Sequence, residues 1–178
     1  WNPDALVKML LLPEPIGVGS YPQKNSWGRW TSLPKVIEEE GKHHPVGRVL
    51  EDGTALIQAE YLAGGFMRIK RALLEQYRDH FKDLRYQDTS ADPGAPNREY
   101  VQFFNCETKT TPDGQRLRWG EDRIFGERLK EMGIQVFIYP NIQFGHYGIK
   151  GWTGNFDTWL RAPKAVQDAE ADPMVQNM

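Results

Sequence analysis

The chain has 178 residues, of which 39% are hydrophobic and 26% charged, and its formal net charge at pH 7 is -2. This length predicts one domain with a sizeable core rather than two independent domains. The near-zero charge provides no basic field to drive nucleic-acid binding, so no nucleic-acid partner is expected. The longest apolar runs fall far short of ~18 residues, so we predict no membrane span. The expected location is the cytoplasm, with peripheral attachment to a membrane as the alternative.

Helix and strand signals alternate along the first half of the chain. Asn2-Pro3-Asp4 supplies an N-cap, a proline at the first helical position and an acid in the first turn, which predicts a helix to about Leu12. Strands are expected at residues 16–20, 47–50, 54–59 and 63–69, and an amphipathic helix at residues 71–81. The Asp52-Gly53 pair predicts that the second and third of these strands form an antiparallel hairpin.

The second half begins with a long polar stretch, residues 83–98, of the kind that is usually functional or mobile. A helix over residues 121–132 follows, because Phe125, Leu129 and Met132 recur at helical spacing, and Gly133 is expected to end it. We then predict a strand at 136–139, an extended piece at 142–146 and a short helix at 155–160. This order of predicted helices and strands indicates an α/β fold with a mixed sheet flanked by helices over residues 1–162. Residues 163–178 are expected to form a polar tail or linker.

Two chemically reactive residue types are given structural interpretations. Cys106 is the chain's single cysteine and cannot form an internal disulfide. It ends an apolar run, residues 100–106, that is typical of a strand, so we predict a core residue rather than a catalytic thiol. His43-His44 suggests metal binding, but adjacent side chains diverge and no carboxylate has suitable spacing. We therefore predict a polar loop there.

Two adjacent carboxylates open the helix predicted at residues 121–132. The positive end of the helix macrodipole favours their ionised form, which makes Asp122 or Glu121 a candidate general base near neutral pH. A purely structural role, in which both side chains only complement the helix N-terminus, remains open. His146 closes the extended piece that follows. A neutral imidazole there could complete a metal site, although an isolated histidine is also commonly a hydrogen-bonded structural residue.

The spacing around these residues resembles a known family. Residues 121–133 read E-D-x-x-F-x-x-R-x-x-x-x-G and residues 140–148 read P-x-I-x-x-x-H-x-G. Two earlier stretches fit in the same order, G-S-Y-P-Q-K at 19–24 and L-A-G-G-F-M-R-I-K-R at 62–71. Together they resemble the C-terminal half of a GT-A fold glycosyltransferase, most closely the family 2 type, and the resemblance extends over residues 1–159.

The resemblance implies catalytic roles for three residues. An inverting GT-A enzyme uses the Asp of its E-D pair as general base, which implies that role for Asp122, with Glu121 beside it in orientation or acceptor binding. Such enzymes hold a divalent cation on the donor diphosphate through a D-x-D motif, often with a histidine at the position of His146. Carboxylate and phosphate oxygens suit Mg or Mn, and one imidazole ligand favours Mn, which would act as a Lewis acid on the leaving group.

Other residues are candidates for substrate binding. In similar enzymes the stretch that matches Gly64-Gly65 lines the donor-sugar pocket, and glycine also permits a close backbone approach; a bulge in a strand is the alternative. Lys24 could reach a phosphate, although an exposed lysine without that role is the common case. Trp27, Trp30 and Trp152 could stack on acceptor sugars, with core packing as the alternative for each.

One family motif has no counterpart in this chain. No D-x-D follows a strand, and in the family that motif lies just ahead of a segment like Trp1-Asn2-Pro3-Asp4. The motif and the nucleotide-binding strands are therefore expected upstream of Trp1. The chain would then hold the acceptor half and the base, and in isolation it should bind donor poorly or not at all.

The predicted function is transfer of a sugar from a nucleotide-diphospho-sugar donor to a hydroxyl of a saccharide or glycoconjugate acceptor. It requires the carboxyl of Asp122 and the imidazole of His146 to face one cavity. The alternative is a non-catalytic carbohydrate or nucleotide-sugar binding module on a degenerate GT-A scaffold. A third interpretation, a structural module, predicts no pocket near Asp122.

Overall fold

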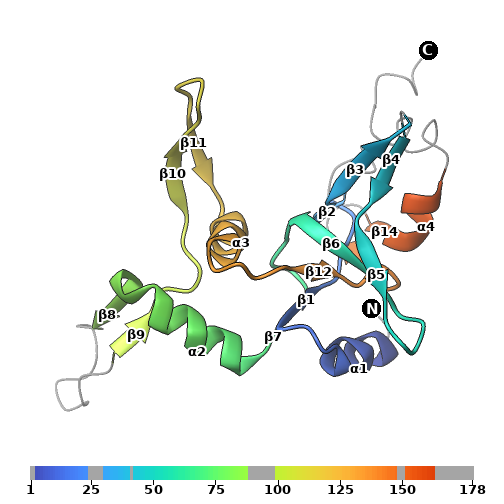
Figure 1. The fold of residues 1–178 in the computed structure, drawn as a ribbon, viewed down its shortest axis with the longest axis horizontal. Coiled ribbons are helices and arrows are strands. Elements are labelled where there is room, and N and C mark those ends of the chain that lie inside the picture. The colour runs from blue at the N-terminus through green and yellow to red at the C-terminus, as the bar shows by residue number, and fades with distance from the viewer. Residues whose placement is uncertain (1–2, 24–29, 41, 88–98, 148–150, 163–178) are drawn as a thin grey trace. The chain divides into compact units, whose positions relative to one another are not determined.

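The computed structural model describes residues 3–23, 30–40, 42–87, 99–147 and 151–162. The chain divides into two compact units, one formed by Trp1–Arg68 with Val136–Met178 and the other by Ile69–Gln135. Its class is α/β with a mixed sheet, as predicted (Figure 1). No helix in the described ranges is long and apolar enough to cross a bilayer.

A six-stranded mixed sheet organises the first unit. Its strand order is β2-β6-β12-β1-β7, and β5 also pairs with β6. β1 runs parallel to β12, while β6 is antiparallel to β12, β2 and β5. The strands are β1 (Ile16–Val18), β2 (Leu33–Pro34), β5 (Gly47–Val49), β6 (Ala55–Tyr61), β7 (Met67–Ile69) and β12 (Phe137–Ile138). The hairpin predicted at Asp52-Gly53 is the β5–β6 pair, and Gly53 has a φ of +82°.

Helix α1 (Pro3–Leu11) packs its inner face on this sheet. Ala5 and Met9, four residues apart, are both buried and join side chains of β6 and β12 in one apolar cluster. The cluster consists of Ala5, Met9, Leu12, Leu56, Phe137, Tyr139, Ile142 and Phe144. The predicted helix and the strand at 136–139 are therefore confirmed as elements of one core.

Arg68, from strand β7 of the sheet, caps the C-terminal end of α1. Arg68 Nε donates to the carbonyl of Met9 at 2.9 Å, and its two terminal nitrogens donate to the carbonyls of Leu12 and Glu14, both at 2.6 Å. The last carbonyls of a helix have no partner within the helix and carry partial negative charge. The guanidinium of Arg68 donates hydrogen bonds to three carbonyls of this segment, and its positive charge offsets their partial negative charge. It also joins α1 to β7.

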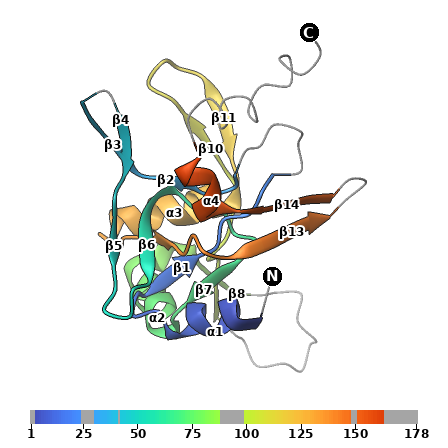
Figure 2. The same cartoon turned by 90° about the vertical axis from the view of Figure 1, so that its right-hand side faces the viewer.

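Two further hairpins belong to this unit, and neither was predicted as a hairpin from the sequence. β3 (Val36–Glu39) pairs with β4 (Lys42–Pro45), and β13 (Gln143–Tyr147) pairs with β14 (Gly151–Asn155). Figure 2 shows β13 and β14 projecting side by side. His43 and His44 lie in β4, so the predicted polar loop is wrong, although both residues are exposed. Helix α4 (Phe156–Arg161) follows β14 and confirms the short helix predicted at 155–160; Asn155 is its N-cap.

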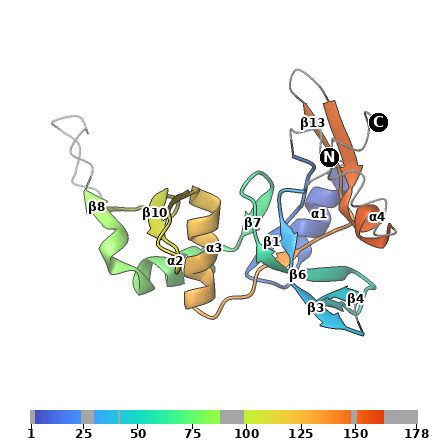
Figure 3. The same cartoon turned by 90° about the horizontal axis from the view of Figure 1, so that it is seen from above.

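The described part of the second unit is built from helices α2 and α3 and the hairpins β8–β9 and β10–β11 (Figure 3). Its elements are α2 (Arg71–His80), the 3-10 turn η1 (Lys82–Leu84), β8 (Arg85–Gln87), β9 (Glu99–Val101), β10 (Glu107–Thr110), β11 (Arg116–Trp119) and α3 (Glu121–Glu131). Aromatic rings fill its core: Tyr77 of α2 lies 5.2 Å from Phe125 of α3 and 5.5 Å from Phe103, centroid to centroid. Gly133 has a φ of +73° directly after α3, as its predicted C-terminal position requires.

Three local predictions are corrected. The strand predicted at 63–69 covers only β7, because Gly64 and Gly65 form a turn before it. In the polar stretch predicted at 83–98, residues 83–87 are regular, because they belong to η1 and to β8; residues 88–98 lie outside the described ranges. Cys106 is exposed rather than in the core. The strand in its apolar run ends at Val101, so strand alternation does not bury the thiol.

Candidate functional site

Both predicted catalytic carboxylates lie in the first turn of α3. Gly120 is the N-cap and Glu121 and Asp122 are the first two helical residues. Glu121 is exposed and Asp122 is half-buried. Asp122 precedes Phe125 by three positions and Leu129 by seven, so it lies toward the buried stripe at the open end of the helix. This position gives a carboxylate partly sheltered from water at the positive end of the helix dipole.

Asp122 also has a local hydrogen bond. Its Oδ1 accepts the backbone N–H of Arg123 at 2.7 Å, which satisfies one of the N-terminal donors of α3. A carboxylate held by such a bond has a fixed orientation, as a general base requires. The same bond is also what a purely structural role at the helix N-terminus predicts, so the contact is compatible with both interpretations of Asp122.

The sequence analysis missed the side chains around these carboxylates. The Sγ of Cys106 lies 3.7 Å from Glu121 Oε2, in position to donate a weak hydrogen bond. The guanidinium of Arg123 stacks on Trp119, 3.6 Å from the ring centroid. A thiol, a cation and an indole therefore accompany the two acids. The thiol of Cys106 directly precedes β10, the cation of Arg123 belongs to α3, and the indole of Trp119 ends β11.

The β10–β11 hairpin brings these neighbours to the start of α3. Its four residue pairs run from Glu107 opposite Trp119 to Thr110 opposite Arg116, and the turn contains Gly114 at a φ of +83°. Thr111-Pro112-Asp113-Gly114 is a turn signal that could have predicted this hairpin. Pairing Glu107 with Trp119 brings Cys106 close to the residues that begin α3.

The helix that carries the carboxylates is anchored by Arg128. Its Nη1 donates to Asn105 Oδ1 at 2.6 Å and to the hydroxyl of Tyr77 at 3.2 Å, and its Nη2 forms an ion pair with Glu107. Lys109 binds the other carboxylate oxygen of Glu107 at 2.5 Å. The hydrogen bond from Lys109, together with one from Asn105 and the positive charge of Arg128, holds the pKa of Glu107 below its usual value. This network fixes α3 against α2 and β10.

The predicted donor-binding glycines lie in the exposed turn between β6 and β7. A β-carbon added at Gly65 would overlap the side chain of Tyr21, whose hydroxyl oxygen would be its nearest neighbour. Tyr21 in turn packs edge-on against Phe144, with ring centroids 5.9 Å apart. The approach of Tyr21 therefore accounts for glycine at position 65 without a ligand. The role of Gly64-Gly65 in donor binding stays a prediction.

Gly65→Ala should destabilise the first unit by about 1–3 kcal/mol, because the added methyl must displace the Tyr21 ring. Urea unfolding of the purified chain measures the change. The same substitution in a Tyr21→Ala background provides the control, since removing the ring removes the overlap. An equal loss of stability in both backgrounds would show that Tyr21 is not the reason for glycine at this position.

Two more predicted site residues are paired across the β13–β14 hairpin. His146 of β13 and Trp152 of β14 are direct partners in the antiparallel register. The structure describes the backbone of both but not their side chains. Lys24 and Trp27 lie in residues 24–29, outside the described ranges. Trp30 is buried and packs 5.1 Å from Phe156, ring to ring, so the core-packing alternative is correct for it.

The predicted cavity shared by Asp122 and His146 stays a prediction, because the first belongs to the second unit and the other to the first unit. Among the side chains that the structure describes, no group of three or more His, Cys, Asp or Glu residues could hold a metal ion. The side chain of His146 is not among them, so the Mn or Mg site stays a prediction.

No protein-family model matches this chain, and neither a curated protein nor a solved structure matches it. The interpretation of the site therefore rests on its residues and on their geometry.

Proposed function

We propose that the protein is a glycosyltransferase that moves a sugar from a nucleotide-diphospho-sugar donor to a hydroxyl of a saccharide or glycoconjugate. Asp122 is the general base in this reaction. Its carboxylate accepts the proton of the acceptor hydroxyl, whose oxygen forms a bond to the anomeric carbon of the donor. The bond between that carbon and the phosphate oxygen breaks, and the nucleoside diphosphate leaves. The scaffold in this proposal is a GT-A fold.

The observation that carries the proposal is the position of the Glu121-Asp122 pair at the start of α3, in the spacing that the sequence shares with GT-A enzymes. Three features of the second unit support it. Asp122 is half-buried, which strengthens its interaction with a bound hydroxyl relative to a fully exposed acid. It lies in the first turn of α3, at the positive end of the helix dipole. The network around Arg128 holds the helix in place, as a positioned base requires.

Release of nucleoside diphosphate tests this function. The full-length protein is incubated with a panel of UDP-, GDP- and TDP-sugars, with and without saccharide acceptors and with Mg or Mn present. We expect one donor to be consumed, faster with an acceptor than without. Absence of turnover with the entire panel, in a protein shown to bind one of the donors, would contradict catalysis.

His146→Ala is expected to weaken Mn-dependent donor binding by the full-length protein about tenfold or more, if His146 supplies a metal ligand as proposed. Isothermal titration of the donor at increasing Mn concentrations measures this. His44→Ala is the matched control, because His44 is exposed in a hairpin and is not implicated in binding. An unchanged metal dependence in His146→Ala would remove this residue from the proposed site.

A second candidate is a carbohydrate-binding module without catalysis. The lack of a D-x-D motif after any strand of this chain favours it, because that motif holds the catalytic cation in the family that the chain resembles. This candidate predicts saccharide binding with the same affinity in wild type and Asp122→Asn, and no diphosphate release. The two candidates therefore differ in a single assay.

A further inference from the structure

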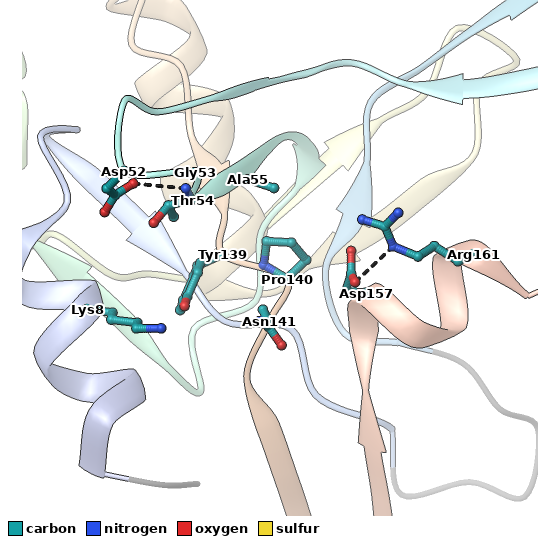
Figure 4. Close-up of a pocket in the computed structure, with 10 residues that line it drawn as sticks. All are labelled: Lys8, Asp52, Gly53, Thr54, Ala55, Tyr139, Pro140, Asn141, Asp157 and Arg161. Atoms are coloured by element: carbon teal, nitrogen blue, oxygen red, sulfur yellow. Dashed lines mark hydrogen bonds and ion pairs between the residues drawn. The ribbon is translucent and has the colours of Figure 1, made fainter.

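A separate polar cavity of about 270 Å³ lies within the first unit. Four segments distant in sequence contribute to it: α1, the turn between β5 and β6, the residues after β12, and α4 (Figure 4). None of its residues was predicted from the sequence as a site. A cavity formed where four segments meet has its shape fixed by the core of the unit rather than by one mobile loop.

Two polar groups, from Lys8 and Tyr139, face each other on one side of the cavity. In the part of the chain that the structure describes, the ammonium of Lys8 makes no ion pair and the hydroxyl of Tyr139 makes no hydrogen bond. Figure 4 shows the ammonium end of Lys8 directed toward the hydroxyl end of Tyr139. Tyr139 is only 3% exposed, so its hydroxyl has little access to water except through this cavity. A buried hydroxyl such as that of Tyr139 gains from a ligand that hydrogen-bonds to it, and the exposed ammonium of Lys8 is within reach of the same ligand.

The carboxylate of Asp52 provides a hydrogen-bond acceptor on the other side of the cavity. Asp52 Oδ1 accepts the backbone N–H of Thr54 at 2.9 Å. This bond, a second one from the Thr54 side chain and the charge of Lys8 lower the pKa of Asp52, so its carboxylate is ionised at neutral pH. Lys8 influences Asp52 but does not pair with it within 4.0 Å, which leaves space between a strong donor and a strong acceptor. A hydroxyl group, which donates and accepts at once, can connect the two.

The charges that line the cavity cancel. Lys8 and Arg161 are opposed by Asp52 and Asp157, and Arg161 Nε already binds Asp157 Oδ2 at 2.9 Å. An anion placed near Lys8 would also approach Asp52, and a cation placed near Asp52 would approach Lys8. Electrostatics therefore favours a neutral ligand with several groups that both donate and accept. Asn141 adds an amide to this lining, whose oxygen accepts a hydrogen bond from Asn155 and whose nitrogen remains a donor.

We propose that this cavity binds one neutral monosaccharide unit, with hydroxyl groups of the sugar between Lys8, Asp52 and Asn141. Its volume is slightly below the ~300 Å³ at which pockets for drug-sized ligands begin, so it suits a single sugar ring. The site is not catalytic, and the inference does not depend on the glycosyl transfer proposed above. It would give the protein a second point of attachment to a glycan.

Titration of the full chain with glucose, galactose, mannose and N-acetylglucosamine, followed by amide chemical shifts in NMR spectra, tests the proposal. Inorganic phosphate and glycine are the probes for an anion and for a zwitterion. We expect at least one sugar to shift the amides of Gly53, Thr54 and Asn141, with a dissociation constant of about 1–10 mM, as is usual for a ligand of this size. Phosphate and glycine should leave these amides unchanged.

Lys8→Met and Asn141→Ala should each raise that dissociation constant about fivefold to tenfold, because each removes one hydrogen bond to the sugar. Both residues are exposed, so neither change should unfold the chain. Lys42→Met, in an exposed hairpin, is the matched control and should bind like the wild type. Equal affinity in Lys8→Met and Lys42→Met would overturn the proposal. So would the absence of sugar-induced shifts up to ~100 mM, or shifts caused by phosphate or glycine but by no sugar.

Discussion

Asp122→Asn is expected to lower glycosyl transfer by the full-length protein at least about 100-fold, while affinity for the nucleotide-sugar donor stays nearly unchanged. Asparagine has the size and shape of aspartate, and its oxygen can still accept the N–H of Arg123 that Asp122 accepts at 2.7 Å. The start of α3 is therefore preserved. The variant loses only the ability to take a proton from the acceptor hydroxyl, so the chemical step slows and donor binding does not.

Two measurements isolate that effect. Diphosphate release gives the rate and isothermal titration gives the donor affinity, each for wild type and variant. Asp83→Asn, an exposed position in the same unit, is the matched control and should keep the wild-type rate. A rate within twofold of the wild type in Asp122→Asn would remove this residue as the base. An equal loss in Glu121→Gln would indicate that the pair acts together in orienting the acceptor.

The elements predicted correctly are those whose signals are local. The β5–β6 hairpin follows from Asp52-Gly53, since Gly53 adopts the positive φ that this turn requires. Helix α3 follows from Phe125 and Leu129, which are both buried, and from Gly133 after its end. The placement of Glu121 and Asp122 in a first helical turn is a consequence of the same local signals. This part of the site could therefore be found from the sequence.

Two of the hairpins that were missed, β3–β4 and β10–β11, lack a buried apolar face. All eight residues of β3 and β4 are exposed, and so are most residues of β10 and β11, so neither hairpin shows the apolar alternation that marks a half-buried strand. For β10–β11, Asp113-Gly114 was the remaining signal. Missing that hairpin also meant missing the contact between Cys106 and Glu121, because only the strand pairing brings them together.

Residues whose environment depends on distant segments could not be predicted at all. Cys106 was expected in the core because its run is apolar, yet the strand there ends five residues earlier and the thiol is exposed. Gly65 was interpreted through a ligand, whereas the group that approaches it is the ring of Tyr21, 44 positions earlier in the chain (65 minus 21). The polar cavity around Lys8 and Asp52 brings together segments with no shared motif, so no pattern in the sequence indicates it.

Arg128→Met should destabilise the second unit by about 3 kcal/mol, the largest effect on folding that we expect. Arg128 is the only side chain of α3 seen to bind Tyr77, Asn105 and Glu107 in the described residues, and it is 14% exposed. Methionine keeps the length of the apolar stem but leaves three polar groups without their shared donor. Urea unfolding measures the loss, and Lys130→Met on the exposed side of the same helix should cost less than about 0.5 kcal/mol.

The pH dependence of the same variant separates the ion pair from packing. The folded-state pKa of Glu107 lies below its unfolded value, so its interactions stabilise the protein above the unfolded pKa and lose this effect as pH falls through the folded pKa. The stability difference between wild type and Arg128→Met should therefore shrink as the pH falls well below 4.5, the ordinary pKa of a glutamate. Part of the dependence should survive in the variant, because the hydrogen bond from Lys109 is the largest cause of the lowered pKa. A difference that stays constant from pH 7 to about 3 would mean that Arg128 stabilises α3 through its hydrogen bonds to Asn105 and Tyr77 and its packing against Phe81, rather than through the ion pair with Glu107.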